Sequence, residues 1–477
     1  MPYLKMNPRS VRKVTREALK TRALIFAGII VYLIQFEWMY RELISPAWAY
    51  LGLRYETPSS LATAIGWAGS LLPVLWMPLT LRRPSQAIYW LLYLTVYIPS
   101  MLVPYYLNLQ PVSELAEISL YFLGGFALIN MSFRIPLPVQ IRMELRQKDF
   151  WVMFWLLYVT MTLVFMAALG STLRLVSFAE RYDLRLASRQ VESGALVEYF
   201  RNWLAFCLNP FLLAMGCLRK RPTLFLAGVA GGILLYSSAA ARAWLAGIFY
   251  IPVLYFALQG KRKGTYFGLR MVLFTCAMFL LPIVLHVAES PFEGIILDPF
   301  VIRNHVNSGA MTGLYAKFFS ENPLTYGSQI TGIDLLLKYP YSMPIPFLMG
   351  VYIADAPDSS ANAHLWADGI ASFGPVGVLI LSILLAGVFF VLDFCCQHLD
   401  PVKVALVVGI HYANLSNVAL SSSFFGGGLA FSIVLLMLMP RSLLEPAGQR
   451  KRRFPLYKLN RLPTASPSEM GIPSVGS

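Results

Sequence analysis

The side chains best suited to chemistry lie in a polar stretch between two long apolar runs. This stretch, residues 289–368, contains Arg303, His305, His364 and Asp368. Guanidinium groups bind phosphate and diphosphate through paired hydrogen bonds, and histidine and carboxylate side chains accept protons in general base catalysis. We therefore predict a catalytic site in which Arg303 binds a phosphorylated group and one of the two histidines or Asp368 accepts a proton.

Further arginines stand outside this stretch. Arg181 and Arg185 lie in a second polar stretch, residues 171–201, and Arg242 stands in SSAAARAWLAG, at a short turn between two apolar runs. An arginine among small residues points into a helix bundle or its mouth; reaching lipid phosphates is the alternative. No CxxC or HExxH motif is present, so we expect arginines, rather than a metal or other cofactor, to stabilise negative charge.

Several of these residues can also have ordinary structural roles. Asp368 stands just before an apolar run, where a carboxylate can cap the free N–H groups of a helix. His305 and His364 can be ordinary polar loop residues. Asn362 can form a turn as readily as it can bind a sugar.

The elements that would position these residues are apolar helices. Of 477 residues, 57% are hydrophobic and 13% are charged, whereas soluble chains carry roughly 25% charged residues. Uncharged runs of about 20 residues are long enough to cross a hydrocarbon layer of about 30 Å. We therefore predict an all-α fold, a polytopic membrane helix bundle of about twelve transmembrane helices. The expected spans are 23–40, 61–80, 84–113, 118–133, 150–173, 202–218, 222–241, 243–260, 271–288, 369–392 and two within 404–440.

The charge distribution predicts the orientation of this bundle. With the N-terminus in the cytoplasm, inner segments hold 28 Lys and Arg and 7 Asp and Glu, whereas outer segments hold 11 and 17. Cytoplasmic loops carry an excess of Lys and Arg, so the basic N-terminal segment 1–22 and the basic, disordered tail 441–477 are predicted inside. The net charge of +15 then needs no nucleic-acid partner.

Both polar stretches face outside in this orientation, within the bundle domain 23–440. The larger one, 289–368, connects the ninth and tenth spans. Within it, Met311–Ser320 has the spacing of a short amphipathic helix that lies in the interface or folds back over the bundle. Arginines beside apolar helices suit a lipid-linked diphosphate. If that ligand carries a sugar, breaking its glycosidic bond leaves negative charge on the diphosphate for the arginines to stabilise.

Four runs of residues carry a resemblance to a known family. They are YDLR, EYFRNWLAFCLNPFLLA, IRNHVNSGAMTGLYAKFFSENPLTYG and SANAHLWADGIASFGPVGVLILSILLAG. In this order, over roughly residues 180–395, the chain resembles the bacterial oligosaccharide repeat-unit polymerases, which are O-antigen polymerases of the Wzy type. In that family an Asn and an Asp-Gly pair precede a long helix, as in the last run.

The resemblance implies a metal-independent membrane glycosyltransferase that needs no cofactor. It would polymerise undecaprenyl-diphosphate-linked oligosaccharide repeat units at the periplasmic face of the bacterial inner membrane, for O-antigen or exopolysaccharide synthesis. Its implied partners are the lipid-linked oligosaccharide, membrane lipid and a chain-length regulator protein. By position, the matched residues are Arg185, Arg242, Arg303, Asn362 and Asp368. Many relatives have Lys where this chain has Arg242, and His305 matches no fixed family residue.

Two other functions are kept as alternatives. An O-antigen ligase also works at the outer face, with arginines and a histidine in a large loop. A lipid-linked oligosaccharide flippase or other transporter also fits twelve spans with both termini inside. The polar residues gather in an outer loop rather than at the middle of the bilayer, which favours an enzyme over a transporter.

Overall fold

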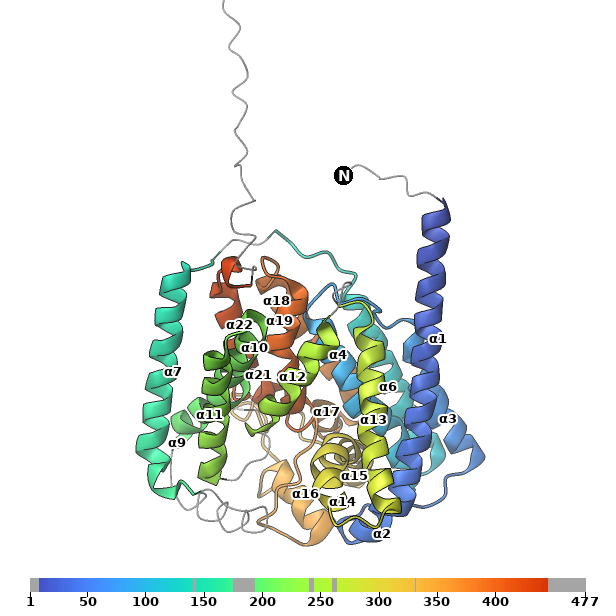
Figure 1. Cartoon of the computed structure of the whole chain (residues 1–477). Coiled ribbons are helices and arrows are strands. Elements are labelled where there is room, and N and C mark those ends of the chain that lie inside the picture. The colour runs from blue at the N-terminus through green and yellow to red at the C-terminus, as the bar shows by residue number, and fades with distance from the viewer. Residues whose placement is uncertain are drawn as a thin grey trace, which may run out of the picture.

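Figure 1 shows the chain as a bundle of helices, in a computed structural model that describes residues 8–139, 143–174, 194–239, 244–259, 264–330 and 332–444. Every regular element within these ranges is a helix, and Thr80 and Thr265 form an isolated bridge. The prediction of an all-α fold is confirmed for this part of the chain.

Seven helical segments of the described chain are long and apolar enough to cross a membrane. They are Arg16–Leu51, Ser85–Leu107, Val112–Ser132, Gln147–Leu169, Phe267–Val287, Leu365–Cys395 and Leu420–Leu438. The five other predicted spans, 61–80, 202–218, 222–241, 243–260 and one of the two within 404–440, overlap helices that are shorter or less apolar, so the count of twelve stays a prediction. The chain is therefore a multi-pass membrane protein by the length and composition of its helices.

These long segments are built from one or more helices each. They comprise α1 (Pro8–Met39), α2 (Ser45–Trp48), α4 (Ser85–Leu92), α5 (Ile98–Leu107), α6 (Val112–Ser132), α7 (Gln147–Leu169), α13 (Phe267–Val287), α17 (Leu365–Phe373), α18 (Gly377–Cys395), α21 (Leu420–Phe424) and α22 (Leu429–Leu438). Wider π-helical turns η1 (Tyr40–Ile44) and η4 (Tyr93–Tyr97) continue α1 and α4 into the next helix.

The remaining helices are shorter or carry more polar residues. They are α3 (Ser60–Leu71), α9 (Gly194–Trp203), α10 (Asn209–Arg219), α11 (Pro222–Ala239), α12 (Ala246–Leu258), α14 (Glu293–Ile296), the π-helical η8 (Leu297–Val306), α15 (Asn307–Glu321), α16 (Ile345–Ala354), α19 (Pro401–Val408) and α20 (Tyr412–Leu415). The predicted outer loop 289–368 thus contains α14, η8, α15 and α16, so much of it is helical.

Different helices lie at the two ends of the bundle. The start of α1 and the end of α22 lie at one end, whereas α2, α14 and α16 lie at the other, which we call the distal end (Figure 1). The predicted outer loop therefore folds at the end away from both termini of the described chain.

The centre of the bundle is the continuous helix formed by α4, η4 and α5. All of its residues, Ser85–Leu107, are buried, and α15 packs against α5. The helix predicted at Met311–Ser320 corresponds to α15, and of the two placements predicted for it, in the interface or folded back over the bundle, the structure agrees with the second. The helix is buried on almost every face, because small residues such as Gly309 and Gly313 let its backbone approach α5 closely.

We expect Gly309→Ala to lower the thermal stability of the protein by several degrees. A methyl group at Gly309 would lie 2.4 Å from the carbonyl oxygen of Pro99 and 2.7 Å from Val103 Cβ, so the two helices must separate. Thermal unfolding of the purified protein in detergent measures this effect. The matched control is Gly387→Ala in α18, where an added Cβ meets nothing within 4 Å; equal midpoints for the two variants would contradict the prediction.

Candidate active site around Asp368

Asp368 lies in the first turn of α17, which begins after the extended segment that follows α16. The preceding residue His364 caps this helix, since its Nδ1 accepts a hydrogen bond of 3.3 Å from the backbone N–H of Ala367. Asp368 therefore does not cap the helix, and its half-buried carboxylate is available for other contacts.

Polar side chains surround the Asp368 carboxylate. The side-chain nitrogen of Gln329, Nε2, lies 3.4 Å from Asp368 Oδ1 and donates a hydrogen bond to Ser372 Oγ at 2.8 Å. Ser372 in turn donates to the backbone carbonyl of Asp368 at 3.0 Å, so Gln329 bridges two residues one helical turn apart. The Oε1 of Gln329 is buried and has no hydrogen-bond partner among the described residues. The Gln329 Oε1 atom and the Asp368 carboxylate can therefore each accept further hydrogen bonds at the centre of the cluster.

Two tyrosines lie within electrostatic range of Asp368. The pKa of Tyr339 is raised to about 12, chiefly by burial and to a smaller extent by the neighbouring Tyr341 and the Asp368 carboxylate. Burial also raises the pKa of Tyr315, with a smaller contribution from Asp368. Both phenols are committed as donors, Tyr315 to the carbonyl of Ala361 at 3.1 Å and Tyr339 to that of Met343 at 3.0 Å. We call Asp368, Gln329, Ser372, Tyr315 and Tyr339 the Asp368 cluster.

His364 is held on both ring nitrogens. Because Nδ1 accepts from a backbone N–H, Nε2 carries the proton and donates to the carbonyl of Ser308 at 3.1 Å; it also lies 2.8 Å from Thr312 Oγ1. The ring is fully buried, and burial lowers the pKa of His364 to about 3. These contacts hold the start of α17 against α15. His364 is therefore better suited to positioning Asp368 than to accepting a proton.

His305 faces a different part of the bundle. Its Nδ1 donates to the carbonyl of Phe300 at 3.1 Å, and its ring lies 4.9 Å from that of Phe279 and 6.2 Å from that of Tyr32. Burial lowers the pKa of His305 to about 4. The described structure shows no contact between His305 and the Asp368 cluster, so the predicted site does not assemble around both residues.

Arg303 is exposed at the distal end. Its side chain is 57% exposed, and Nε lies 3.5 Å from Asp298 Oδ1. It is not in contact with Asp368 among the described residues, but its element η8 runs directly into α15, which packs against α17. The guanidinium is thus free to reach a ligand that approaches from outside the bundle.

The other predicted binding residues are only partly described. Asn362 is exposed, and its side-chain oxygen accepts a hydrogen bond of 2.8 Å from Ser360. Arg181, Arg185 and Arg242 lie outside the described residues. Arg201, at the end of the second polar stretch, stacks 4.8 Å from the centre of the Trp244 ring.

Sequence reasoning missed most of the Asp368 cluster. Gln329, Tyr315 and Tyr339 come from α15 and from the irregular chain after it, and no local pattern marks them as neighbours of Asp368. Ser372 had a signal, because it follows Asp368 by four residues and so shares its helix face. Among the described residues, no three His, Cys, Asp or Glu side chains group closely enough to hold a metal ion.

Comparison with known proteins finds no family model, no characterised protein and no solved structure that matches the chain. The candidate site therefore has to be interpreted from its own geometry.

Proposed function

We propose that this chain is a glycosyltransferase that polymerises undecaprenyl-diphosphate-linked oligosaccharide repeat units at the periplasmic face of the bacterial inner membrane. The observation that supports it best is a half-buried carboxylate, Asp368, in a polar cluster at the start of α17, which packs against α15. A half-buried carboxylate in an apolar bundle suits a reaction between a lipid-linked donor and a sugar hydroxyl.

The proposed step joins two repeat units. A hydroxyl oxygen of the acceptor sugar attacks the anomeric carbon of the donor, and the bond from that carbon to the diphosphate oxygen breaks. The lipid diphosphate leaves with the bonding electrons, and Asp368 takes the proton of the hydroxyl. Arg303, with arginines of the 171–201 stretch, neutralises the charge that develops on the diphosphate.

The structure also suggests what its neighbours contribute. Gln329, which is anchored on Ser372, orients the Asp368 carboxylate, which favours proton transfer at a fixed position. His364 fixes the start of α17 against α15. The exposed Asn362 lies six residues before Asp368 and is suited to hydrogen bonding with sugar hydroxyls.

In this proposal the chain crosses the membrane about twelve times with both termini inside. The start of α1 and the end of α22 share one end of the bundle, which supports an even number of crossings, and the excess of Lys and Arg in the segments assigned to the inside supports the orientation. A chain-length regulator protein is the expected partner, because a polymerase acting alone does not define when elongation stops.

The test of function is a gel of surface and lipid-linked glycans from cells with and without this gene. Loss of long polymer, with single repeat units still transferred to the final acceptor, supports the polymerase. Long polymer that accumulates on the carrier lipid would instead assign the chain as a ligase. Repeat units retained at the cytoplasmic face would assign it as a flippase, and the arginines would then bind a transported lipid diphosphate.

The orientation has its own test by chemical labelling. The five native cysteines, which form no disulfide bond, are first replaced, and a single Cys is then introduced at exposed Lys338 or exposed Arg134. We expect a membrane-impermeant maleimide to label Lys338→Cys in intact spheroplasts, and Arg134→Cys only after the membrane is permeabilised. The reverse pattern would place the candidate site in the cytoplasm and contradict the proposed donor.

A further inference from the structure

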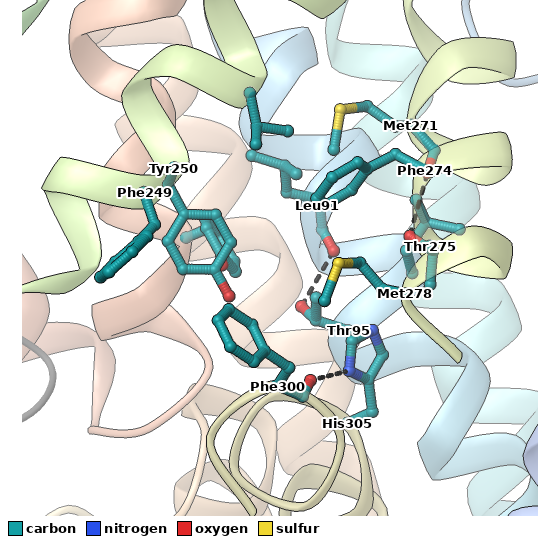
Figure 2. A pocket seen from close by; sticks show the side chains of 13 residues that line it. Leu91, Thr95, Phe249, Tyr250, Met271, Phe274, Thr275, Met278, Phe300 and His305 are labelled. Atoms are coloured by element: carbon teal, nitrogen blue, oxygen red, sulfur yellow. Dashed lines mark hydrogen bonds between the residues drawn. The ribbon is translucent and has the colours of Figure 1, made fainter. Parts of the chain in front are cut away.

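A cavity within the bundle lies apart from the Asp368 cluster. Its volume is about 60 Å³, and its lining comes from α4 with η4, α12, α13, η8 and α20, with no residue of α17. One water-sized position requires about 15 Å³, so the cavity accepts the end of a molecule with a few heavy atoms. Its walls are mostly apolar, including Phe249, Phe274, Met271 and Met278 (Figure 2).

His305 supplies the most informative polar atom of the cavity wall. The His305 side chain is buried, with only 7% of the residue exposed, and its Nδ1 donates a hydrogen bond to the Phe300 carbonyl. Its other ring nitrogen, Nε2, is buried and has no hydrogen-bond partner among the described residues. Figure 2 shows this second nitrogen on the side of the ring where Thr95, Thr275 and Met278 lie. A buried acceptor without a partner is unfavourable, so this site favours a ligand that donates a hydrogen bond to it.

Two hydroxyl groups beside His305 also present acceptors. Thr95 donates its proton to the carbonyl of Leu91 at 2.9 Å, and Thr275 donates to that of Met271 at 3.0 Å. Each oxygen therefore offers only lone pairs to the cavity. The Tyr250 and Tyr412 rings, which meet edge-on at 5.2 Å, complete the polar lining; a phenol can accept as well as donate.

One residue that lines the cavity reaches the surface of the bundle. Phe249 lies on the rim and is 58% exposed, as expected for a side chain in contact with hydrocarbon. The methionines in the wall are flexible and adapt to chains of irregular shape. A ligand can thus enter from the bilayer with its polar end first and leave its chain among the lipids.

We propose that this cavity binds a lipid alcohol, with its terminal hydroxyl donating a hydrogen bond to His305 Nε2 and its hydrocarbon chain extending past Phe249 into the bilayer. A carboxylate or diphosphate does not suit the wall, because an anion needs several donors. A quinone carbonyl is an acceptor and would leave Nε2 unpaired. An ammonium group would need a carboxylate, and none lines the cavity among the described residues.

The test measures saturable binding of radiolabelled 1-dodecanol to the full-length protein in lipid nanodiscs, with empty nanodiscs subtracted. Unlabelled dodecyl methyl ether, which has the same chain but no donor, is the competing ligand. We expect the alcohol to compete at least tenfold better than the ether, since the ether leaves the buried acceptor unpaired. Equal competition, or no saturable binding of the alcohol, would overturn the proposal.

Two variants locate the binding site within the molecule. His305→Phe keeps a ring between Tyr32 and Phe279 but removes the acceptor, and it should lower affinity for the alcohol about tenfold. Val253→Phe fills the cavity and leaves His305 in place, so it should abolish binding even if the first variant folds poorly. The control is Val152→Phe, at a residue of α7 that is 59% exposed. Wild-type binding by both cavity variants would contradict the assignment.

Discussion

Replacing Asp368 with Asn is expected to lower the rate of polymer formation about 10²–10⁴-fold, the usual contribution of a positioned general base. The amide has almost the same shape as the carboxylate and can still meet Gln329, which lies 3.4 Å from it. It cannot accept the proton of the attacking sugar hydroxyl. The rate is measured with purified protein in proteoliposomes and lipid-linked repeat units, by the length of the glycan ladder against time.

The matched control for this variant is Asp355→Asn. Asp355 lies in the same predicted outer segment, is exposed, and has a backbone φ of 49°, a left-handed conformation that Asn tolerates well. We expect its rate, membrane level and unfolding midpoint to equal those of the wild type. Full-length polymer made by Asp368→Asn at the wild-type rate would remove Asp368 from the reaction, whatever the control shows.

The helical framework was predictable because charge is expensive in a bilayer. Segments such as Gln147–Leu169 and Phe267–Val287 combine sufficient length with almost no charge, so composition alone identifies them. The number of crossings was harder to predict. Helices such as α19 (Pro401–Val408) and α20 (Tyr412–Leu415) are short and joined by a tighter helical turn, and a hydrophobic run in the sequence does not reveal such a break.

Contacts between distant segments were not predictable from local patterns. Ser85 begins α4, and its backbone N–H and hydroxyl both donate to the Asp393 carboxylate of α18, at 3.1 and 2.7 Å. The helix thus receives its cap from a residue more than 300 positions later in the chain. In the same way His364, a residue type rarely expected as a cap, caps α17 and leaves Asp368 free for the cluster.

The helical form of η8 explains why two neighbouring candidates separate. Arg303 and His305 are two residues apart, and both were predicted to act in one site. Residues two apart point to nearly opposite sides of a helix, in a π-helix as in an α-helix. Arg303 is consequently exposed, whereas His305 is buried against Phe279. The sequence shows the two side chains, but not that this part of the predicted loop is helical.

Replacing Arg303 with Ala is expected to lower the rate of polymer formation about 10²–10³-fold, as when one group that stabilises a developing anion is removed. Arg303→Lys should recover only part of the rate, because an ammonium lacks the paired donors of a guanidinium. The protein should still insert into the membrane, since the exposed ion pair with Asp298 contributes at most about 1 kcal/mol. The same proteoliposome assay measures the rate, and immunoblotting of membranes measures insertion.

The kinetic form of the loss decides what Arg303 does. If it stabilises charge that appears only as the diphosphate leaves, Arg303→Ala lowers kcat and leaves KM for the lipid-linked unit nearly unchanged. A raised KM with normal kcat would instead make it a ground-state binding residue. Arg41→Ala is the control, because Arg41 is 52% exposed and pairs with Glu42 at 2.7 Å, much as Arg303 pairs with Asp298. An equal loss of rate in both variants would show that surface charge in general, rather than Arg303, supports the reaction.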